Sequence, residues 1–234
     1  MKKFILIIIA LLAFAPVAKA QKLKALDLGL SVKWANMNVG ASSPEEYGDY
    51  FAWGEVKTKR YYGDYSGYKH FDDKRFHKYN YYHYKGSEVD SLIVLQKDDD
   101  VATERMGSRW RMPTADEVEE LLTKCNFTPG KLNGAKGLFV TSRDTTVERD
   151  TLFLPLAGRK DFGNFRLYPS ASAYYWTSTL VGPEVYSKAK MDSIDSRGDL
   201  VRSAKCMVIV GEQPPVINYI KRKIGCVVRP VSNR

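Results

Sequence analysis

Aromatic and titratable side chains are concentrated in one short stretch of this 234-residue chain. Residues 58–86 hold eight tyrosines and all three histidines, interleaved with Lys and Asp and with few aliphatic residues. Tyr presents a broad apolar face and a polar tip at low entropic cost, which suits the recognition of sugars or proteins. The composition equally fits a long loop that packs on itself and covers a sheet. The tyrosines that we predict to contact a ligand are Tyr61, Tyr62, Tyr65, Tyr68, Tyr81, Tyr82 and Tyr84.

A second group of chemically active residues is basic and lies near the end of the chain. The first 20 residues carry three Lys and no acid, so residues 21–234 hold 33 Lys and Arg against 27 Asp and Glu, a net charge of +6. Residues 186–234 account for all of this excess, with ten cations and four acids. A basic end favours acidic polymers such as acidic polysaccharides, although a solvated basic face has the same composition.

Three consecutive cations, Lys221, Arg222 and Lys223, stand immediately before a predicted strand. Alternation along an extended chain would place Lys221 and Lys223 on one face, with Arg222 opposite. We predict that these three residues contact the ligand.

The densest acidic cluster is Asp98, Asp99 and Asp100. Adjacent carboxylates fit either a set of cation ligands or a solvated loop, and the sequence leaves both open. The chain has no Cys-x-x-Cys or Cys/His spacing and no motif that joins a nucleophile to its base. We therefore assign no catalytic residue, no metal site and no cofactor, and whether Asp98 to Asp100 bind a cation stays open.

The clearest of the elements that must position these residues is a helix that begins at Thr114. Thr114 and Glu117 form a capping box, in which each side chain satisfies an orphan backbone amide at the helix start. The helix is predicted to end near Asn126. Its apolar face is formed by Val118, Leu121, Leu122 and Cys125.

Strand patterns surround this helix. Apolar residues alternate with small or polar ones over residues 28–34, which is typical of a half-buried strand. Asn133-Gly134 is turn material between the helix and the next strand. Few helices with many strands predict an α+β fold with an antiparallel sheet. The later strands are predicted at residues 137–141, 151–154, 174–178, 206–210 and 224–229.

The first 20 residues fit a secretory signal peptide. Lys2 and Lys3 precede an apolar run over residues 4–17, and Ala18-Lys19-Ala20 fits the small-x-small cleavage pattern. The run is shorter than the roughly 20 apolar residues that span a bilayer, so no membrane span is predicted. We expect residues 21–234 to be exported as a single domain and to be secreted, periplasmic or held at the cell surface.

Five motifs follow one another along nearly the whole exported part. Together they resemble the Fibrobacter succinogenes major paralogous domain family, secreted bacterial proteins related to the Lcl C-terminal domain. The resemblance covers residues 26–232. The motifs are LGLSVKWA at 28–35, YGDYFAWGE at 47–55, WRMPT at 110–114, YWTS at 175–178 and GCVVRPV at 225–231.

The resemblance implies a C-type-lectin-like fold, mainly an antiparallel sheet with one or two helices and long loops. Residues 111–119 are also similar to the helix start of the formylglycine-generating enzyme family, which shares this scaffold. Shared scaffolds carry different functions, so this similarity bears on the fold alone. Gln213-Pro214-Pro215 matches only the first two positions of the calcium-binding run of lectins with this fold.

Cysteine pairing is predicted in the light of this fold. Cys206 and Cys226 lie on β-patterned runs near the chain end, and a closing strand is a natural place to staple a lectin-like fold. We therefore predict a disulfide between them. Cys125 is predicted to stay reduced, because it lies on the apolar face of the helix. The family often has a cysteine where this chain has Met37, so that candidate partner for Cys125 is missing here.

These observations lead us to expect an exported, non-enzymatic binding protein that recognises glycans or surface polymers at the cell envelope. Loop tyrosines would stack on the ligand, and nearby Lys and Arg would add hydrogen bonds and charge. The alternative is a structural or adhesive surface subunit that binds protein partners. Nucleic acid is not an expected partner.

Overall fold

The computed structural model describes residues 22–72, 74–81, 87–162, 166–182 and 201–233. The export segment at residues 1–20 and the predicted ligand contacts Tyr82 and Tyr84 lie outside the described residues. The predicted α+β class is confirmed, because the described residues contain two α-helices and mainly antiparallel strands. The helical elements are η1 (Lys97–Asp99), α1 (Val101–Met106) and α2 (Ala115–Lys124).

Every ladder between the named strands is antiparallel. One sheet joins the two ends of the described chain, in the order β1 (Ala25–Leu26), β2 (Val32–Ala35) and β13 (Val231–Asn233). A second joins β5 (Cys125–Leu132), β6 (Ala135–Ser142) and β7 (Leu152–Pro155). The central sheet has the order β10 (Ser172–Leu180), β11 (Ser203–Val210) and β12 (Val216–Lys221).

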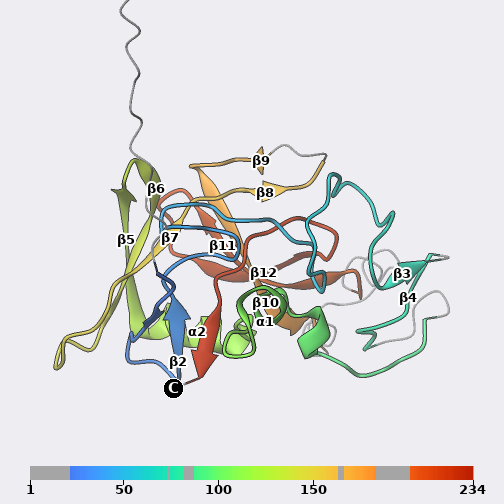
Figure 1. The fold of residues 1–234 in the computed structure, drawn as a ribbon, viewed down its shortest axis with the longest axis horizontal. Coiled ribbons are helices and arrows are strands. Elements are labelled where there is room, and N and C mark those ends of the chain that lie inside the picture. Colours follow the sequence, from blue (N-terminus) through green and yellow to red (C-terminus); the bar gives the residue numbers. More distant parts are fainter. Residues whose placement is uncertain (1–21, 73, 82–86, 163–165, 183–200, 234) are drawn as a thin grey trace, which may run out of the picture.

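Two short hairpins complete the set, β3 (Phe71–Asp72) with β4 (Arg75–Phe76), and β8 (Arg159–Lys160) with β9 (Arg166–Leu167). In Figure 1 the central sheet lies between the β5–β6–β7 sheet at one end and the β3–β4 hairpin at the other. The β8–β9 hairpin lies along one margin of this view, and α1 and α2 lie towards the opposite margin.

Helix α2 begins where the sequence predicts. The Thr114 hydroxyl accepts from the Glu117 amide at 3.2 Å, and a Glu117 carboxylate oxygen accepts from the Thr114 amide at 2.8 Å. Arg111 pairs with the same carboxylate at 2.5 Å. The helix ends at Lys124, because Cys125 turns to an extended conformation and begins β5.

The strand predictions are partly right. Predicted strands at 137–141, 151–154, 174–178 and 206–210 correspond to β6, β7, β10 and β11. Asn133 and Gly134, with φ of 47° and 86°, form the two-residue turn between β5 and β6. The sequence patterns predicted neither β5, which contains Pro129 and Gly130, nor β12.

The predicted closing strand at 224–229 is wrong as a regular element. This run is extended and buried, but its neighbours hold it through isolated bridges instead of one ladder. Cys226 exchanges backbone hydrogen bonds with Phe51, and Trp176 donates its amide to the Val227 carbonyl at 3.0 Å. The run therefore passes between the 50–53 loop and β10, and strand pairing resumes at β13.

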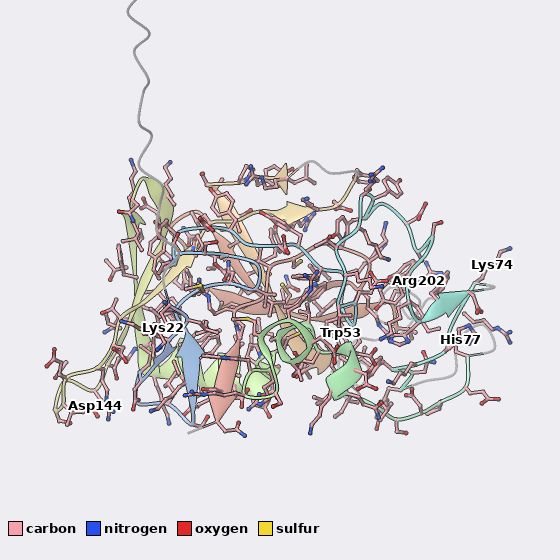
Figure 2. The ribbon with its side chains drawn as sticks, viewed as in Figure 1. Lys22, Trp53, Lys74, His77, Asp144 and Arg202 are labelled. Atoms are coloured by element: carbon pink, nitrogen blue, oxygen red, sulfur yellow. The ribbon has the colours of Figure 1, made fainter. Side chains whose placement is uncertain are left out.

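Tryptophans fill the core between these elements. Trp34, Trp53, Trp110 and Trp176 are all buried, as their apolar surroundings predict. The Trp53 indole donates to the Thr177 carbonyl and the Trp176 indole donates to the Phe51 carbonyl, each at 2.8 Å. Figure 2 shows Trp53 in the interior, whereas Lys74 and His77 lie at the tip that carries β3 and β4. Within the described ranges no helix is long and apolar enough to cross a membrane.

Candidate functional site

We call residues 58–86 the tyrosine-rich segment. Tyrosine hydroxyl groups of this segment donate hydrogen bonds to backbone carbonyls of residues 50–53. Tyr62 donates to the Tyr50 carbonyl at 2.6 Å, and Tyr68 donates to the Trp53 carbonyl. Both rings are buried, with exposed fractions of 1% and 3%. The prediction that Tyr62 and Tyr68 contact a ligand is therefore wrong, because their faces pack against protein and burial raises the pKa of each hydroxyl.

Other tyrosines of the segment differ in exposure. Tyr65 is half-buried, and its hydroxyl donates to the Arg202 carbonyl at 3.0 Å while its ring contacts Phe71 and Phe76. Tyr81 is also half-buried and packs against the core. Tyr61 is 48% exposed, so it keeps an open ring face. The segment thus corresponds mainly to the self-packed loop that the sequence left open.

Asp99, which lies outside the tyrosine-rich segment, binds four of its side chains. Its carboxylate accepts hydrogen bonds from Lys69 at 2.6 Å, Lys78 at 2.6 Å, His70 at 2.9 Å and the Tyr79 hydroxyl, and the side chain is 1% exposed. Burial raises the pKa of the carboxyl, but these hydrogen bonds outweigh burial and bring the pKa far below its ordinary range. The carboxylate is therefore ionised and already surrounded by donors.

Asp100 is committed to the backbone instead. Its carboxylate accepts from the amides of Ala102 and Thr103 at the start of α1 and from the Met112 amide at 2.8 Å. Burial raises the pKa of this carboxyl. The acidic cluster is thus a junction between the tyrosine-rich segment, α1 and the 110–114 motif. Among the described residues, no group of three His, Cys, Asp or Glu side chains is placed to hold a metal ion.

Arg222 is also part of the interior. Its guanidinium is 1% exposed, donates to the carbonyls of Tyr79 at 2.7 Å and Val201 at 2.6 Å, and lies 4.4 Å from the centre of the Phe76 ring. The prediction that Arg222 contacts a ligand is wrong, because a group so enclosed cannot reach one. Burial differs along the run, since Arg222 is buried, Lys221 is exposed and Lys223 is half-buried. The predicted extended chain is wrong here, because β12 ends at Lys221 and a turn follows, in which the Ile224 amide donates to the Lys221 carbonyl at 3.0 Å.

Lys221 and Lys223 line one open groove of about 470 Å³, which we call the β12 groove. Two exposed aromatic rings flank these lysines, Phe162 at 63% and Tyr219 at 45%. The ammonium group of Lys223 lies 5.9 Å from the centre of the Phe162 ring. The remaining lining residues are Arg159, Asp161, Ser203, Ile220 and Ile224.

The charges of the β12 groove are held in place by neighbours. Arg159 pairs with Asp161 at 3.3 Å and stacks over Tyr174, with 4.8 Å between its guanidinium carbon and the ring centre. Lys223 donates to the Gly63 carbonyl, which ties the groove to the tyrosine-rich segment. Burial lowers the pKa of Lys223, and it does so although the charge of Asp161 raises it. The groove therefore offers flat apolar faces beside cationic and acidic hydrogen-bonding groups.

All three cysteines are buried free thiols. The predicted disulfide between Cys206 and Cys226 is thus not formed, although the two thiols are neighbours. Burial, and then the hydrogen bond and charge of Cys206, raise the pKa of the Cys226 thiol well above its ordinary value. Disulfide formation proceeds through a thiolate, so a raised pKa slows it. Burial also raises the pKa of Cys125, to about 11.

The sequence missed most of the groove. Arg159, Asp161, Phe162 and Tyr219 belong to no motif, and the one local signal is Phe162 next to Asp161, outside the apolar runs. No family model, no curated protein and no solved structure matches this chain. The chemistry of the β12 groove is therefore the basis on which its function must be argued.

Proposed function

We propose that this chain is an exported, non-enzymatic binding protein that recognises glycans or surface polymers through the β12 groove. The observation that carries the proposal is the pair of exposed rings, Phe162 and Tyr219, beside Lys221 and Lys223. Most large apolar side chains among the described residues are buried, so two open rings in one groove need a reason. Aromatic faces pack against the apolar faces of sugar rings, and the lysines add charge-assisted hydrogen bonds.

A C-type-lectin-like fold is part of the same proposal. It is supported by the five motifs at residues 28–35, 47–55, 110–114, 175–178 and 225–231. It is also supported by the combination of antiparallel sheets, two helices and long loops. Export is supported by the charged and apolar pattern of residues 1–20.

A second candidate is the adhesive subunit that binds a protein partner. It is favoured by β12, which pairs with β11 alone within the described part of the chain and exposes Val216 at 53%. A strand at a sheet edge can accept an added strand from a partner. Such a partner would contact the backbone of β12 and depend less on the Phe162 ring.

The experiment compares the mature chain with Phe162→Ala combined with Tyr219→Ala on a glycan array and in a pull-down from envelope extracts. Tyr168→Ala is the matched control, because Tyr168 is 62% exposed but does not line the groove. Glycan binding by the wild type and the control, with about tenfold or greater loss in the double variant, supports the proposal; two stacking contacts at roughly 1 kcal/mol each predict this loss. Absence of glycan binding, with a protein captured by all three, favours the second candidate.

A further inference from the structure

A second cavity, of about 540 Å³, shares strand β8 with the β12 groove. Arg159 and Asp161 line the β12 groove, whereas Lys160 between them lines the second cavity. Successive side chains of a strand point to opposite faces, which explains the division. We call this cavity the β8–β9 pocket. Its charged lining is formed by Asp49, Lys59, Arg60, Lys160 and Arg166.

Positive charge dominates the β8–β9 pocket. Lys59 is paired with Glu55 at 2.7 Å, and Asp49 is the one acid in the lining. Arg60, Lys160 and Arg166 add three further cations around the same space. A concave site with a net excess of cations concentrates anions.

Lys160 and Arg166 face each other directly across the β8–β9 ladder. Cβ atoms of directly opposed residues lie roughly 5 Å apart, and like charges in this arrangement destabilise the pair. Burial lowers the pKa of Lys160, the positive charge of Arg166 lowers it further, and Asp49 raises it. The hairpin thus holds two cations against their mutual repulsion, and an anion between them would relieve it.

Protein groups hold both cations in position. The ammonium group of Lys160 lies 5.1 Å from the centre of the Tyr50 ring, and the guanidinium of Arg166 lies 5.2 Å from that of Tyr47. The backbone of Lys160 exchanges two hydrogen bonds with Gly225, at 2.7 and 2.8 Å. Cation–π contacts and a fixed strand preorganise the pair, which lowers the entropic cost of binding.

We propose that the β8–β9 pocket binds an oxyanion group, a sulfate ester or a carboxylate, of an acidic polysaccharide. Guanidinium and ammonium groups bind such oxygens through charge-assisted hydrogen bonds, and a guanidinium can do so through two parallel bonds. The identity of the polymer rests on the proposed function, but the oxyanion chemistry does not. Because consecutive residues of β8 line the two sites, one polymer with repeated acidic groups can contact both.

The first test uses inorganic sulfate and acetate as probes, by calorimetric titration and thermal unfolding at low ionic strength. The variant is Lys160→Gln with Arg166→Gln. The control is Lys33→Gln with Arg109→Gln, which removes the same charge outside the pocket; Lys33 lies on β2, far from β8 in Figure 1. We expect the probes to bind the wild type and the control, with about tenfold or greater loss of affinity in the variant.

Thermal unfolding separates anion binding from a structural role of the two cations. In the variant, relief of repulsion and loss of the cation–π contacts with Tyr50 and Tyr47 change the melting temperature in opposite directions, so the measured quantity is the further shift that anions add. Anions should raise the melting temperature of the wild type and of the control, and should raise that of the variant less. Equal anion affinities, or equal stabilisation by anions, in the wild type and the variant would overturn the proposal.

The second test separates the two oxyanion sources and the two sites. Heparin fragments carry sulfate and carboxylate groups, alginate oligomers carry carboxylates, and a neutral oligomer carries neither. Binding of one acidic oligomer that is lost in Lys160→Gln with Arg166→Gln identifies the group that the pocket accepts. If sulfate or acetate binds the pocket but no oligomer binds, the oxyanion site stands and the proposed glycan function fails. If oligomers bind through Phe162 and Tyr219 with no change in the pocket variant, the proposed function stands and the pocket proposal fails.

Discussion

The tyrosine-rich segment and the β8–β12 face use aromatic residues in opposite ways. The segment is dense in rings, yet Tyr62, Tyr68 and Tyr79 are buried and donate their hydroxyls to backbone or carboxylate oxygens. The β12 groove has two exposed rings, Phe162 at 63% and Tyr219 at 45%. In this protein, the stretch with the most aromatic residues therefore packs mainly on the core. The exposed aromatic surface of the groove comes from two isolated residues, Phe162 and Tyr219.

The same contrast holds for the three consecutive cations. Arg222 is enclosed between Tyr79, Val201 and Phe76, whereas Lys221 is exposed at the end of β12. One residue of separation, where β12 ends and a turn begins, changes a cation from a surface group into a structural anchor.

The largest expected effect is that of Arg222→Ala. The change removes a buried guanidinium and leaves the carbonyls of Tyr79 and Val201 without its donors, so we expect a loss of about 3–5 kcal/mol in the free energy of unfolding. Lys221→Ala is the matched control and should change stability by less than about 0.5 kcal/mol. Urea unfolding of both variants measures the difference, and similar losses would remove the distinction between the two cations.

Asp99→Asn should cost less at neutral pH, about 2–4 kcal/mol, because the amide keeps some acceptor capacity but loses its charge against Lys69 and Lys78. The pKa of Asp99 is lowered on folding, so its contribution is complete above the unfolded value of about 3.9 and declines as the pH falls below it.

Unfolding midpoints from pH 3 to pH 7 measure this contribution. The difference between the wild type and Asp99→Asn should be constant above about pH 5 and should shrink towards pH 3. A difference that is independent of pH would mean that the ionised carboxylate does not hold the segment.

Local patterns in the sequence predicted the elements whose signals are complete within a few residues. The capping box at Thr114 and the Asn133-Gly134 turn fall in this class, because neighbouring residues alone determine them. Strand β5 was missed because Pro129 and Gly130 are unfavourable strand formers that tertiary pairing with β6 overrides. The 224–229 run looked like a strand, but its partners lie on two separate segments that no local pattern reveals.

The site was less predictable, for a related reason. Lys221 and Lys223 were found from charge and alternation, both of which are local properties. Phe162 and Tyr219 come together only after β8 is placed beside the end of β12, which depends on contacts such as the backbone pair of Lys160 and Gly225. The burial of Tyr62 and Tyr68 likewise depends on backbone carbonyls 12 and 15 residues away, those of Tyr50 and Trp53. A local sequence pattern does not show these acceptors.

The smallest expected effect separates two tyrosines of the same segment. Tyr68→Phe removes a buried hydroxyl that donates to the Trp53 carbonyl, and it leaves that carbonyl without this donor, so it should cost about 1–2 kcal/mol. Tyr61→Phe removes a hydroxyl from a ring that is 48% exposed, so it should cost less than about 0.5 kcal/mol. Both changes keep the ring, so denaturant unfolding of the two variants compares the hydroxyl groups alone. Equal costs would mean that the hydroxyl anchors do not hold the segment and that ring packing alone keeps it buried.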